Sequence, residues 1–290
     1  MKPFSQNRYQ TDKIFNHLFI QPIQKMKKLI IASFAFLFLL TSCDDGFGLF
    51  DTKRITGKGA MEKQDRDAKD FKGIDLMASA DVIIKQGATY KVIVEGQQNI
   101  LDILETVVDN GILSVKFKDG SWNLNFDKLN VYIETPSVSS IEISGSGNLT
   151  LESAFNADDL DIKLSGSGNI KTADGLIAKK INVEISGSGD IKMGSTTATE
   201  LKAAILGSGN FDVKGTAEKA TLTITGSGDI DAYDFMTKST EAQSTGSGNI
   251  QCHATESLDA QIMGSGDIRY TGNPPSVKSK ALGSGEIKTK

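Results

Sequence analysis

The chain has 290 residues and a formal net charge of −4, with acidic and basic residues mixed along its length. It therefore lacks the basic patch that marks a nucleic-acid-binding protein, and we expect no nucleic-acid partner. Its two cysteines, Cys43 and Cys252, are too few for a disulfide framework.

A lipoprotein signal peptide is predicted for residues 26–42. Two lysines precede an apolar run from Leu29 to Leu40, which is shorter than a membrane span. The run leads into Leu-Thr-Ser-Cys, which resembles a bacterial lipobox, a signal in which the cysteine thiol receives a diacylglyceryl group and becomes the new amino terminus. We therefore predict lipidation of Cys43 and an anchor in the cell envelope, at the outer membrane. The alternative is an uncleaved signal anchor that carries this cysteine by chance.

Two further segments surround this signal. Residues 1–25 carry no targeting pattern, and we interpret them as an over-extended start outside the fold. Residues 43–70 mix acidic, basic and glycine residues without a sustained apolar period, which predicts a flexible tether.

A β-rich lead-in is predicted over residues 71–136. Short runs alternate apolar and polar side chains, as around Val82 and Ile84, and this period of two indicates half-buried strands. Turns that contain glycine separate the runs. For residues 100–108 we expect one or two helical turns.

Residues 137–290 contain an internal repeat. A Gly-Ser-Gly motif is followed by Asn, Asp or Glu and then by a large apolar residue, and it occurs eight times at spacings of 18 to 21 residues. A period of this length indicates stacked structural repeats. The paired glycines are Gly145, Gly147, Gly166, Gly168, Gly187, Gly189, Gly207, Gly209, Gly226, Gly228, Gly246, Gly248, Gly264, Gly266, Gly283 and Gly285.

Each repeat is predicted to be a strand, a glycine corner and a second strand. Apolar residues stand two and four positions before most first glycines and four and six positions after them, with polar residues between. Stacking such units buries their apolar faces. We therefore predict an all-β fold, a right-handed parallel β-helix with coils of about 20 residues. Antiparallel hairpins joined by Ser-Gly turns are the competing arrangement.

The corners are expected to be structural. Glycine permits positive φ and close backbone approach. We expect a substitution at Gly187 to disturb two neighbouring coils and one at Gly283, in the last coil, to disturb only one. The column after the corner alternates amides and acids through most of its length, and an amide between carboxylates can donate a hydrogen bond, which favours a stacked ladder. This column is Asn148, Asn169, Asp190, Asn210, Asp229, Asn249, Asp267 and Glu286.

The sequence offers little material for catalysis or metal binding. Gly-Ser-Gly-Asp invites comparison with calcium-binding arrays, but the period differs and one carboxylate per coil is too few for a hard cation. We expect no metal, no cofactor, no catalytic residues and no enzymatic activity. Cys252 and His253 are neighbours, and adjacent strand residues point to opposite faces, so they do not pair. The position of Cys252 in the inward column predicts a core thiol.

The chain resembles the head GIN domain family of auto-transporter adhesins. The resemblance covers about residues 70–290, and it implies a β-helical fold and an envelope location without catalytic residues to transfer. It is carried by Phe71-Lys72-Gly73-Ile74, Asp81-Val82-Ile83-Ile84-Lys85-Gln86-Gly87, Asp109-Asn110-Gly111-Ile112-Leu113 and the repeats that begin with Ile141-Glu142-Ile143-Ser144-Gly145-Ser146-Gly147-Asn148.

We interpret the protein as a non-catalytic envelope lipoprotein, an adhesin or binding module that presents a β-helical surface on the outer or periplasmic side. The expected partners are the membrane, through the lipid anchor, and a glycan or an envelope protein. End-to-end or edge self-association is a further option. Two alternatives stay open, a structural or envelope-sensing domain without its own ligand and a β-helical glycan lyase or hydrolase.

Overall fold

The computed structural model describes residues 53–119 and 122–290. They belong to one unit of the chain, Thr52–Lys290. The predicted over-extended start, the signal peptide and Cys43 lie outside the described residues.

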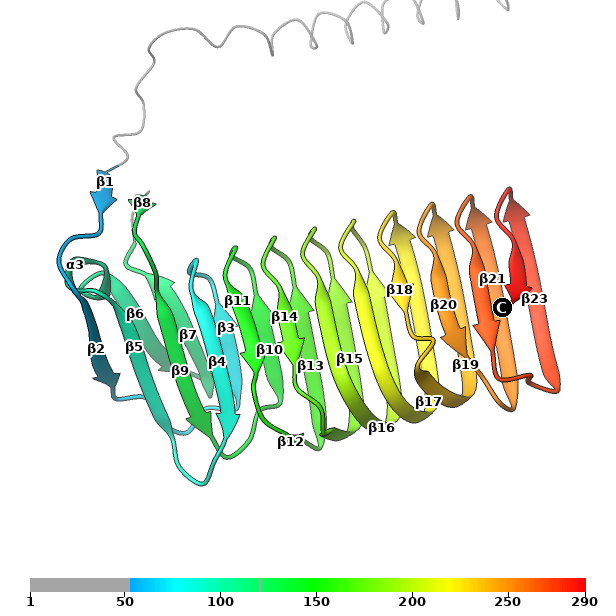
Figure 1. Ribbon diagram of the computed structural model, residues 1–290, viewed down its shortest axis with the longest axis horizontal. Coiled ribbons are helices and arrows are strands. Elements are labelled where there is room, and N and C mark those ends of the chain that lie inside the picture. Colours follow the sequence, from blue (N-terminus) through cyan, green and yellow to red (C-terminus); the bar gives the residue numbers. More distant parts are fainter. Residues whose placement is uncertain (1–52, 120–121) are drawn as a thin grey trace, which may run out of the picture. The chain divides into compact units, whose positions relative to one another are not determined.

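The described residues are almost entirely strands and turns (Figure 1). The lead-in contains β1 Lys53–Thr56, β2 Met61–Arg66, β3 Gly73–Leu76, β4 Asp81–Gln86, β5 Lys91–Gln97, α3 Gln98–Leu101, β6 Leu104–Asp109, β7 Ile112–Phe117, β8 Trp122–Asn125 and β9 Asn130–Thr135. The repeats contain β10 Ser140–Ile143, β11 Asn148–Leu151, β12 Phe155–Asn156, β13 Asp159–Leu164, β14 Ile170–Thr172, β15 Leu176–Ile185, β16 Ile191–Ile205, β17 Phe211–Gly226, β18 Ile230–Asp231, β19 Phe235–Gly246, β20 Ile250–His253, β21 Ser257–Gly264, β22 Ile268–Thr271, β23 Ser276–Gly283 and β24 Ile287–Thr289.

The repeats stack in register as a parallel β-solenoid, which confirms the predicted fold class. Strands that enter a corner pair in parallel with those of the next coil, and we call this set the first-strand column. Strands that leave a corner do the same and form the second-strand column. Every pairing between repeats is parallel, so the antiparallel hairpin alternative is wrong.

A short third column lies between the other two in the middle coils. It joins β12 and the beginning of β15 to the central parts of β16 and β17 and to the beginning of β19. Because β15, β16, β17 and β19 run from this column into the first-strand column without a break, these coils contain unusually long strands. Each long strand therefore bends around one side of the solenoid (Figure 1).

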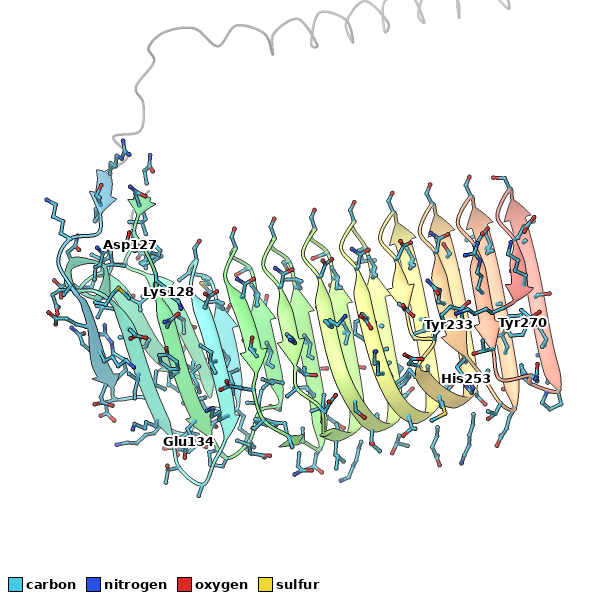
Figure 2. All side chains as sticks on the ribbon, in the orientation of Figure 1. Asp127, Lys128, Glu134, Tyr233, His253 and Tyr270 are labelled. Atoms are coloured by element: carbon cyan, nitrogen blue, oxygen red, sulfur yellow. The ribbon has the colours of Figure 1, made fainter. Side chains whose placement is uncertain are left out.

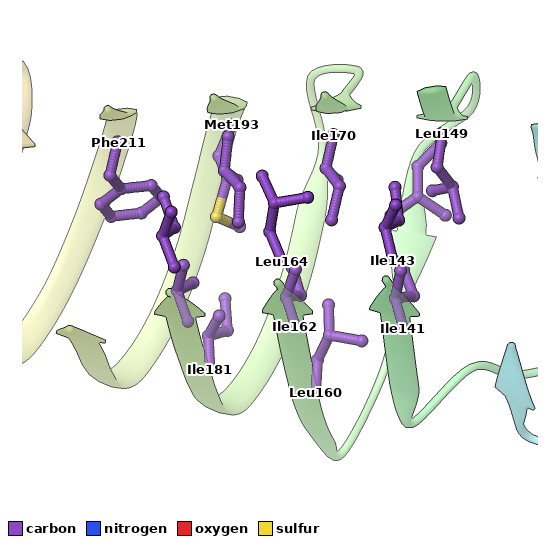
Figure 3. Packing of buried hydrophobic residues seen from close by; sticks show 14 of the residues in the cluster. Ile141, Ile143, Leu149, Leu160, Ile162, Leu164, Ile170, Ile181, Met193 and Phe211 are labelled. Atoms are coloured by element: carbon purple, nitrogen blue, oxygen red, sulfur yellow. The ribbon is translucent and has the colours of Figure 1, made fainter. Parts of the chain in front are cut away.

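The core is a continuous stack of aliphatic side chains inside the coils (Figure 3). Burial alternates along each strand, as in β13, where Leu160, Ile162 and Leu164 are buried and the residues between them are exposed. The same positions in successive coils lie one above another. The alternation of apolar and polar residues in the sequence therefore correctly predicts which side chains of a strand are buried and which are exposed.

The lead-in is part of the solenoid and contains a ninth corner. β3 and β4 form a coil whose corner is Met77-Ala78-Ser79-Ala80, because Leu76 pairs with Ile143 and Asp81 pairs with Asn148 of the next coil. On its other side this coil pairs with β7 and β9. The β3–β4 coil therefore lies between β7 and β9, which follow it in the chain, and the first repeat. This corner does not match the Gly-Ser-Gly motif, because it has alanines in place of glycines.

Antiparallel strands cover the end of the core next to β7 and β9. β6 pairs with β7, and β2 pairs with β5, which pairs with β9. Ile100 and Leu101 of the one-turn helix α3 are buried against this end. Residues 100–108, for which we expect helical turns, thus contain the end of α3 and then strand β6.

The predicted tether also differs from the structure. Within 43–70, residues 53–56 form β1, which pairs with β8, and residues 61–66 form β2. Most of β2 is exposed, and its mainly charged and polar residues show no alternation of apolar and polar side chains in the sequence. Pairing with the regular strand β5 supplies the order that local sequence does not predict.

The glycine corners are required by close approach of successive coils. At each of the sixteen paired glycines, an added Cβ would lie less than 3.0 Å from a backbone carbonyl oxygen of the preceding coil. From Ser188 onward, every middle serine donates its backbone N–H to the carbonyl of the first glycine of the preceding corner, as Ser188 does to Gly166 at 3.2 Å. No side chain fits between corners held this closely.

Two details of the corner prediction are corrected. Of the paired glycines, only Gly226, Gly246, Gly264 and Gly283 have strongly positive φ, so steric exclusion is the reason common to all sixteen. In addition, the atoms nearest to each added Cβ belong to the preceding coil, at Gly187 as at Gly283, so the direct clash is with one coil in both cases. The corner of Ala78 and Ala80 instead borders a hollow of about 630 Å³, whose lining includes Met77, Ser79, Phe117 and Phe126.

We predict that Gly187→Ala lowers the free energy of unfolding by about 1–3 kcal/mol, the usual cost of overpacking. Its methyl group would strike the carbonyl of Gly166. The matched control is Ala80→Gly, which empties a space that already holds a methyl group and should cost about 1 kcal/mol or less. Urea unfolding of both variants measures the difference, and equal destabilisation would contradict the steric account.

Candidate binding surface

The Asn/Asp column forms the ladder expected from its alternation. From Asn169 to Glu286, each residue donates its backbone N–H to the side-chain Oδ1 of the residue one coil before, at 2.7 to 3.2 Å. The Asn side chains add a second donor to the same oxygen, as from Asn210 Nδ2 to Asp190 Oδ1 at 2.8 Å. The ladder thus joins the coils and already uses these oxygens.

The ladder continues into the lead-in, which the sequence did not reveal. Asn148 donates to Asp81 at 2.9 Å, Asp81 pairs in register with Asn130, and Asn130 donates to Glu95 Oε2 at 3.0 Å. Tyr132 Oη donates to the same Glu95 oxygen at 2.8 Å. The sequence signal was hidden because β5 and β9 are antiparallel and contain no corner motif.

These contacts shift two pKa values. Hydrogen bonds from Asn130 and Tyr132 are the main reasons that the pKa of Glu95 lies below its usual value. The hydrogen bond to Glu95, followed by burial, raises the pKa of Tyr132. The Glu95–Tyr132 contact is therefore a charged hydrogen bond that fixes the Tyr132 ring at the start of the second-strand column.

The only cysteine among the described residues is not placed for catalysis. Cys252 is buried in the interior, and burial raises the pKa of its thiol to about 12, so the thiolate is absent near neutral pH. His253, the next residue, is half-buried on the opposite face of β20. Residues 53–119 and 122–290 contain no group of three or more His, Cys, Asp or Glu side chains arranged to hold a metal ion.

Register pairing brings carboxylates side by side on the outer face of the first-strand column, as with Glu241 of β19 and Asp259 of β21. Asp75 of β3 and Glu142 of β10 are register partners on adjacent strands. Burial and then the charge of Glu142 raise the pKa of Asp75. Asp75 is the described carboxylate whose pKa is raised, and a raised pKa is the property expected of the acid in a glycosidase.

The outer side chains of the second-strand column form what we call the second-strand face. It begins at a hollow of about 200 Å³ lined by Ile83, Ile93 and Tyr132 together with Lys85, Lys91, Ile133 and Glu134. Ile93, Tyr132 and Ile83 are successive register partners, so they form a row across the strands. Figure 2 shows the outward side chains along the coils and Glu134 at the rim of this region.

A larger groove of about 600 Å³ follows on the same face. Its walls come from three successive coils and the beginning of a fourth, with Thr150, Lys171 and Lys192 as register partners along one row. Lys171 and Lys192 stand between buried residues of their strands, at positions that alternation assigns to the outside, and both are exposed. The groove itself was not predictable, because it depends on a bulge in β16.

The first-strand face also has a hollow, of about 300 Å³. It lies where Ala204 stands between Glu184 and Thr223 in one row, so a short side chain separates longer ones. Both outer faces are therefore hollowed, the first-strand face at a short side chain and the second-strand face at the bulge in β16.

The fold and these faces define a parallel β-solenoid with polar, grooved outer surfaces. The model of the family described as "Putative auto-transporter adhesin, head GIN domain" matches residues 70–199 and 161–274. These ranges cover more than half of the chain, and the protein therefore belongs to this family of adhesin-like proteins of the cell envelope.

Solved structures of similar proteins share the fold. A "putative lipid binding protein" of Parabacteroides distasonis ATCC 8503 is 28% identical with a TM-score of 0.79, over 82% of this chain and 100% of that chain. A "putative adhesin" of Parabacteroides merdae ATCC 43184 is 25% identical with a TM-score of 0.77, over 82% and 99%. A "putative adhesin" of Bacteroides fragilis NCTC 9343 is 27% identical with a TM-score of 0.64, over 81% and 100%.

A comparison with curated proteins finds no match. Within the part of the chain that the structure describes, no helix has the length and apolar character needed to cross a membrane.

We predict that Asn210→Asp destabilises the fold at neutral pH by about 0.5–1.5 kcal/mol, because it removes the amide that donates to Asp190. It also aligns three carboxylates, with Asp190 before and Asp229 after it, and their repulsion raises their pKa values. The loss is complete above these raised pKa values and is recovered as the pH falls through them. Asp190→Asn is the control, since Asn169 already stacks on Asn148. Chemical unfolding at several pH values measures both, and a pH-independent loss for Asn210→Asp would contradict the ladder.

We also predict that Glu95→Gln flattens the acid limb of the stability profile. The lowered pKa of Glu95 means that its ionised form stabilises the native state above the unfolded value near 4.5. That stabilisation is lost as the pH falls through the folded pKa, a loss that glutamine cannot show. Melting temperatures from about pH 5 to about pH 3 measure the effect, and parallel curves for variant and wild type would exclude it.

Proposed function

We propose that this protein is a non-catalytic binding module of the cell envelope, an adhesin that presents the outer faces of its solenoid to a partner. The observation that carries the proposal is the construction of the grooves. Their walls are equivalent positions of successive coils, separated by about 4.8 Å. A surface with this regular spacing suits an extended polymer better than a small substrate held in a closed cleft.

The proposal includes a lipid anchor at Cys43. The lipobox resemblance and the short apolar run before it support this placement. The expected location is the outer membrane, where the solenoid would face either the periplasm or the exterior. Acyl chains give stable membrane binding when more than one is attached, since each buried methylene contributes about 0.8 kcal/mol.

We predict that Cys43→Ala abolishes metabolic labelling with palmitate and moves the protein from the membrane fraction to the soluble fraction. Cys252→Ala serves as the control, because a buried thiol is no acceptor for lipid. Label that persists in Cys43→Ala would remove the anchor from the proposal.

A glycan-cleaving enzyme is the second candidate, favoured only by the Asp75–Glu142 pair. Adjacent strands bring these carboxylates close together on one face, and the raised pKa of Asp75 is the property expected of a general acid. The distinction from a binding module is experimental. An enzyme would release sugar fragments, and Asp75→Asn would stop the release.

The binding proposal is tested with the full chain, purified in mild detergent. A glycan array and pull-downs from envelope extracts should identify a reproducible ligand that survives without turnover. A deletion strain should attach less well to the surface that carries this ligand. Release of sugar fragments would reject the non-enzymatic function, and absence of any ligand with unchanged attachment would favour a structural or envelope-sensing role.

A further inference from the structure

We propose that the groove around Lys171 binds a carboxylated polysaccharide, with one sugar carboxylate placed against the Lys171 ammonium group. The inference rests on the proposed binding function and names its ligand class and site. The groove lies on the second-strand face and is lined by Thr150, Leu151, Glu152, Lys171, Thr172, Ala173, Asp174, Lys192, Met193, Gly194 and Lys214.

A bulge fixes the floor of this groove. The pairing of β16 with β17 shifts between Met193 and Ser195, which leaves Gly194 as the extra residue. The N–H of Gly194 donates to Thr172 Oγ1 at 3.1 Å, and the N–H of Ser195 donates to Asp174 Oδ1 at 2.6 Å. Bulges re-aim side chains and often occur near binding sites. The hollow is therefore built by local hydrogen bonds and exists before a ligand arrives.

The lysines of the groove differ in whether they are paired. Lys192 donates to Asp212 at 2.6 Å, and this contact raises the pKa of Lys192. Lys214 lies 3.6 Å from Asp234. The Lys171 side chain has no ion pair or hydrogen bond in the part of the chain that the structure describes, and it is exposed. One cation of the three is thus available to an incoming anion.

Acceptors surround this cation. Glu152 is held by Lys85 at 3.1 Å, and Asp174 accepts from Ser195, so both carboxylates stay on the groove wall. Carboxylates accept hydrogen bonds from sugar hydroxyls but repel a polymer that carries several anionic groups on one sugar. A single unpaired ammonium beside two carboxylates and the Thr150 hydroxyl therefore fits a sugar with one carboxylate and several hydroxyls.

The row Thr150, Lys171 and Lys192 runs across the strands, along the direction in which the coils stack. Neighbouring strands lie about 4.8 Å apart. A polysaccharide lying along this row meets the hydroxyl, the free ammonium and the paired ammonium in turn. Its chain can continue over the adjacent hollow, where Ile83 and Tyr132 give an apolar platform for a sugar ring.

The test measures binding of the full chain, in mild detergent, to immobilised polygalacturonate, to neutral dextran and to heparin. We expect binding to polygalacturonate and none to dextran. Lys171→Gln should weaken it about fivefold, the size of one exposed charge pair, and Lys171→Glu should weaken it further. The matched control is Lys180→Gln, which changes an exposed lysine of β15 on the first-strand face.

Several outcomes would overturn the inference. The first is absence of binding to polygalacturonate, and the second is equal affinity of Lys171→Gln and wild type. The third is an equal loss of affinity in Lys171→Gln and Lys180→Gln together with a preference for heparin, because this pattern would indicate unspecific charge attraction. If a ligand found on the array or in envelope extracts binds the Lys171 variants as tightly as wild type, the proposed site is wrong but the binding function stands. A lack of any ligand in those assays would reject the binding function itself.

Discussion

The structure depends on how closely one corner can approach the corner of the coil before it. The carbonyl groups of the Gly-Ser-Gly motif point at the next coil, and they leave no room for a Cβ at either glycine. Hydrogen bonds between corners and between ladder residues then lock the register. Because the side chains of a strand alternate, a register fixed at the corner decides which residues face the core and which face the outside. Core packing, the amide ladder and the outer grooves all follow from this one contact.

The repeats were predictable from the sequence because each coil obeys the same local rule. The period near 20, the inward columns and the ladder partners of Asn148 are all visible in the sequence. The lead-in was less predictable, because its strands pair with strands far away in the chain. β5, for example, pairs with β2, which precedes it, and with β9, which follows it. The corner at Ala78 and Ala80 escaped because alanines replace the glycines of the motif, next to a hollow of about 630 Å³ instead of a closely stacked corner. The site was least predictable, because the groove depends on the Gly194 bulge and on which lysines find partners.

The outer surface contains residues whose side chains link successive coils and residues whose side chains are free to contact a partner. The ladder oxygens accept hydrogen bonds from the following coil, and many surface lysines are held by acids, so these groups contribute mainly to stacking. Lys171 is available, as are the exposed residues of β23, which pairs on one side only within the described residues. Lys278 and Lys280 lie on this edge strand, and lysines on an edge oppose pairing with another strand. The edge is thus less suited to self-association than the second-strand face is to binding a polymer.

The measurement that tests the stacking contact most directly is amide hydrogen exchange of Gly187→Ala compared with wild type. The added methyl points at Gly166, so the account predicts faster exchange at Ser186, Gly187 and Ser188, whose N–H groups bond to the coil before. The corner that begins at Gly207 should keep more of its protection, because the methyl points away from it. A larger increase in exchange at Ser208, whose N–H bonds to the Gly187 carbonyl, than at Ser188, or unchanged exchange at both, would contradict the account.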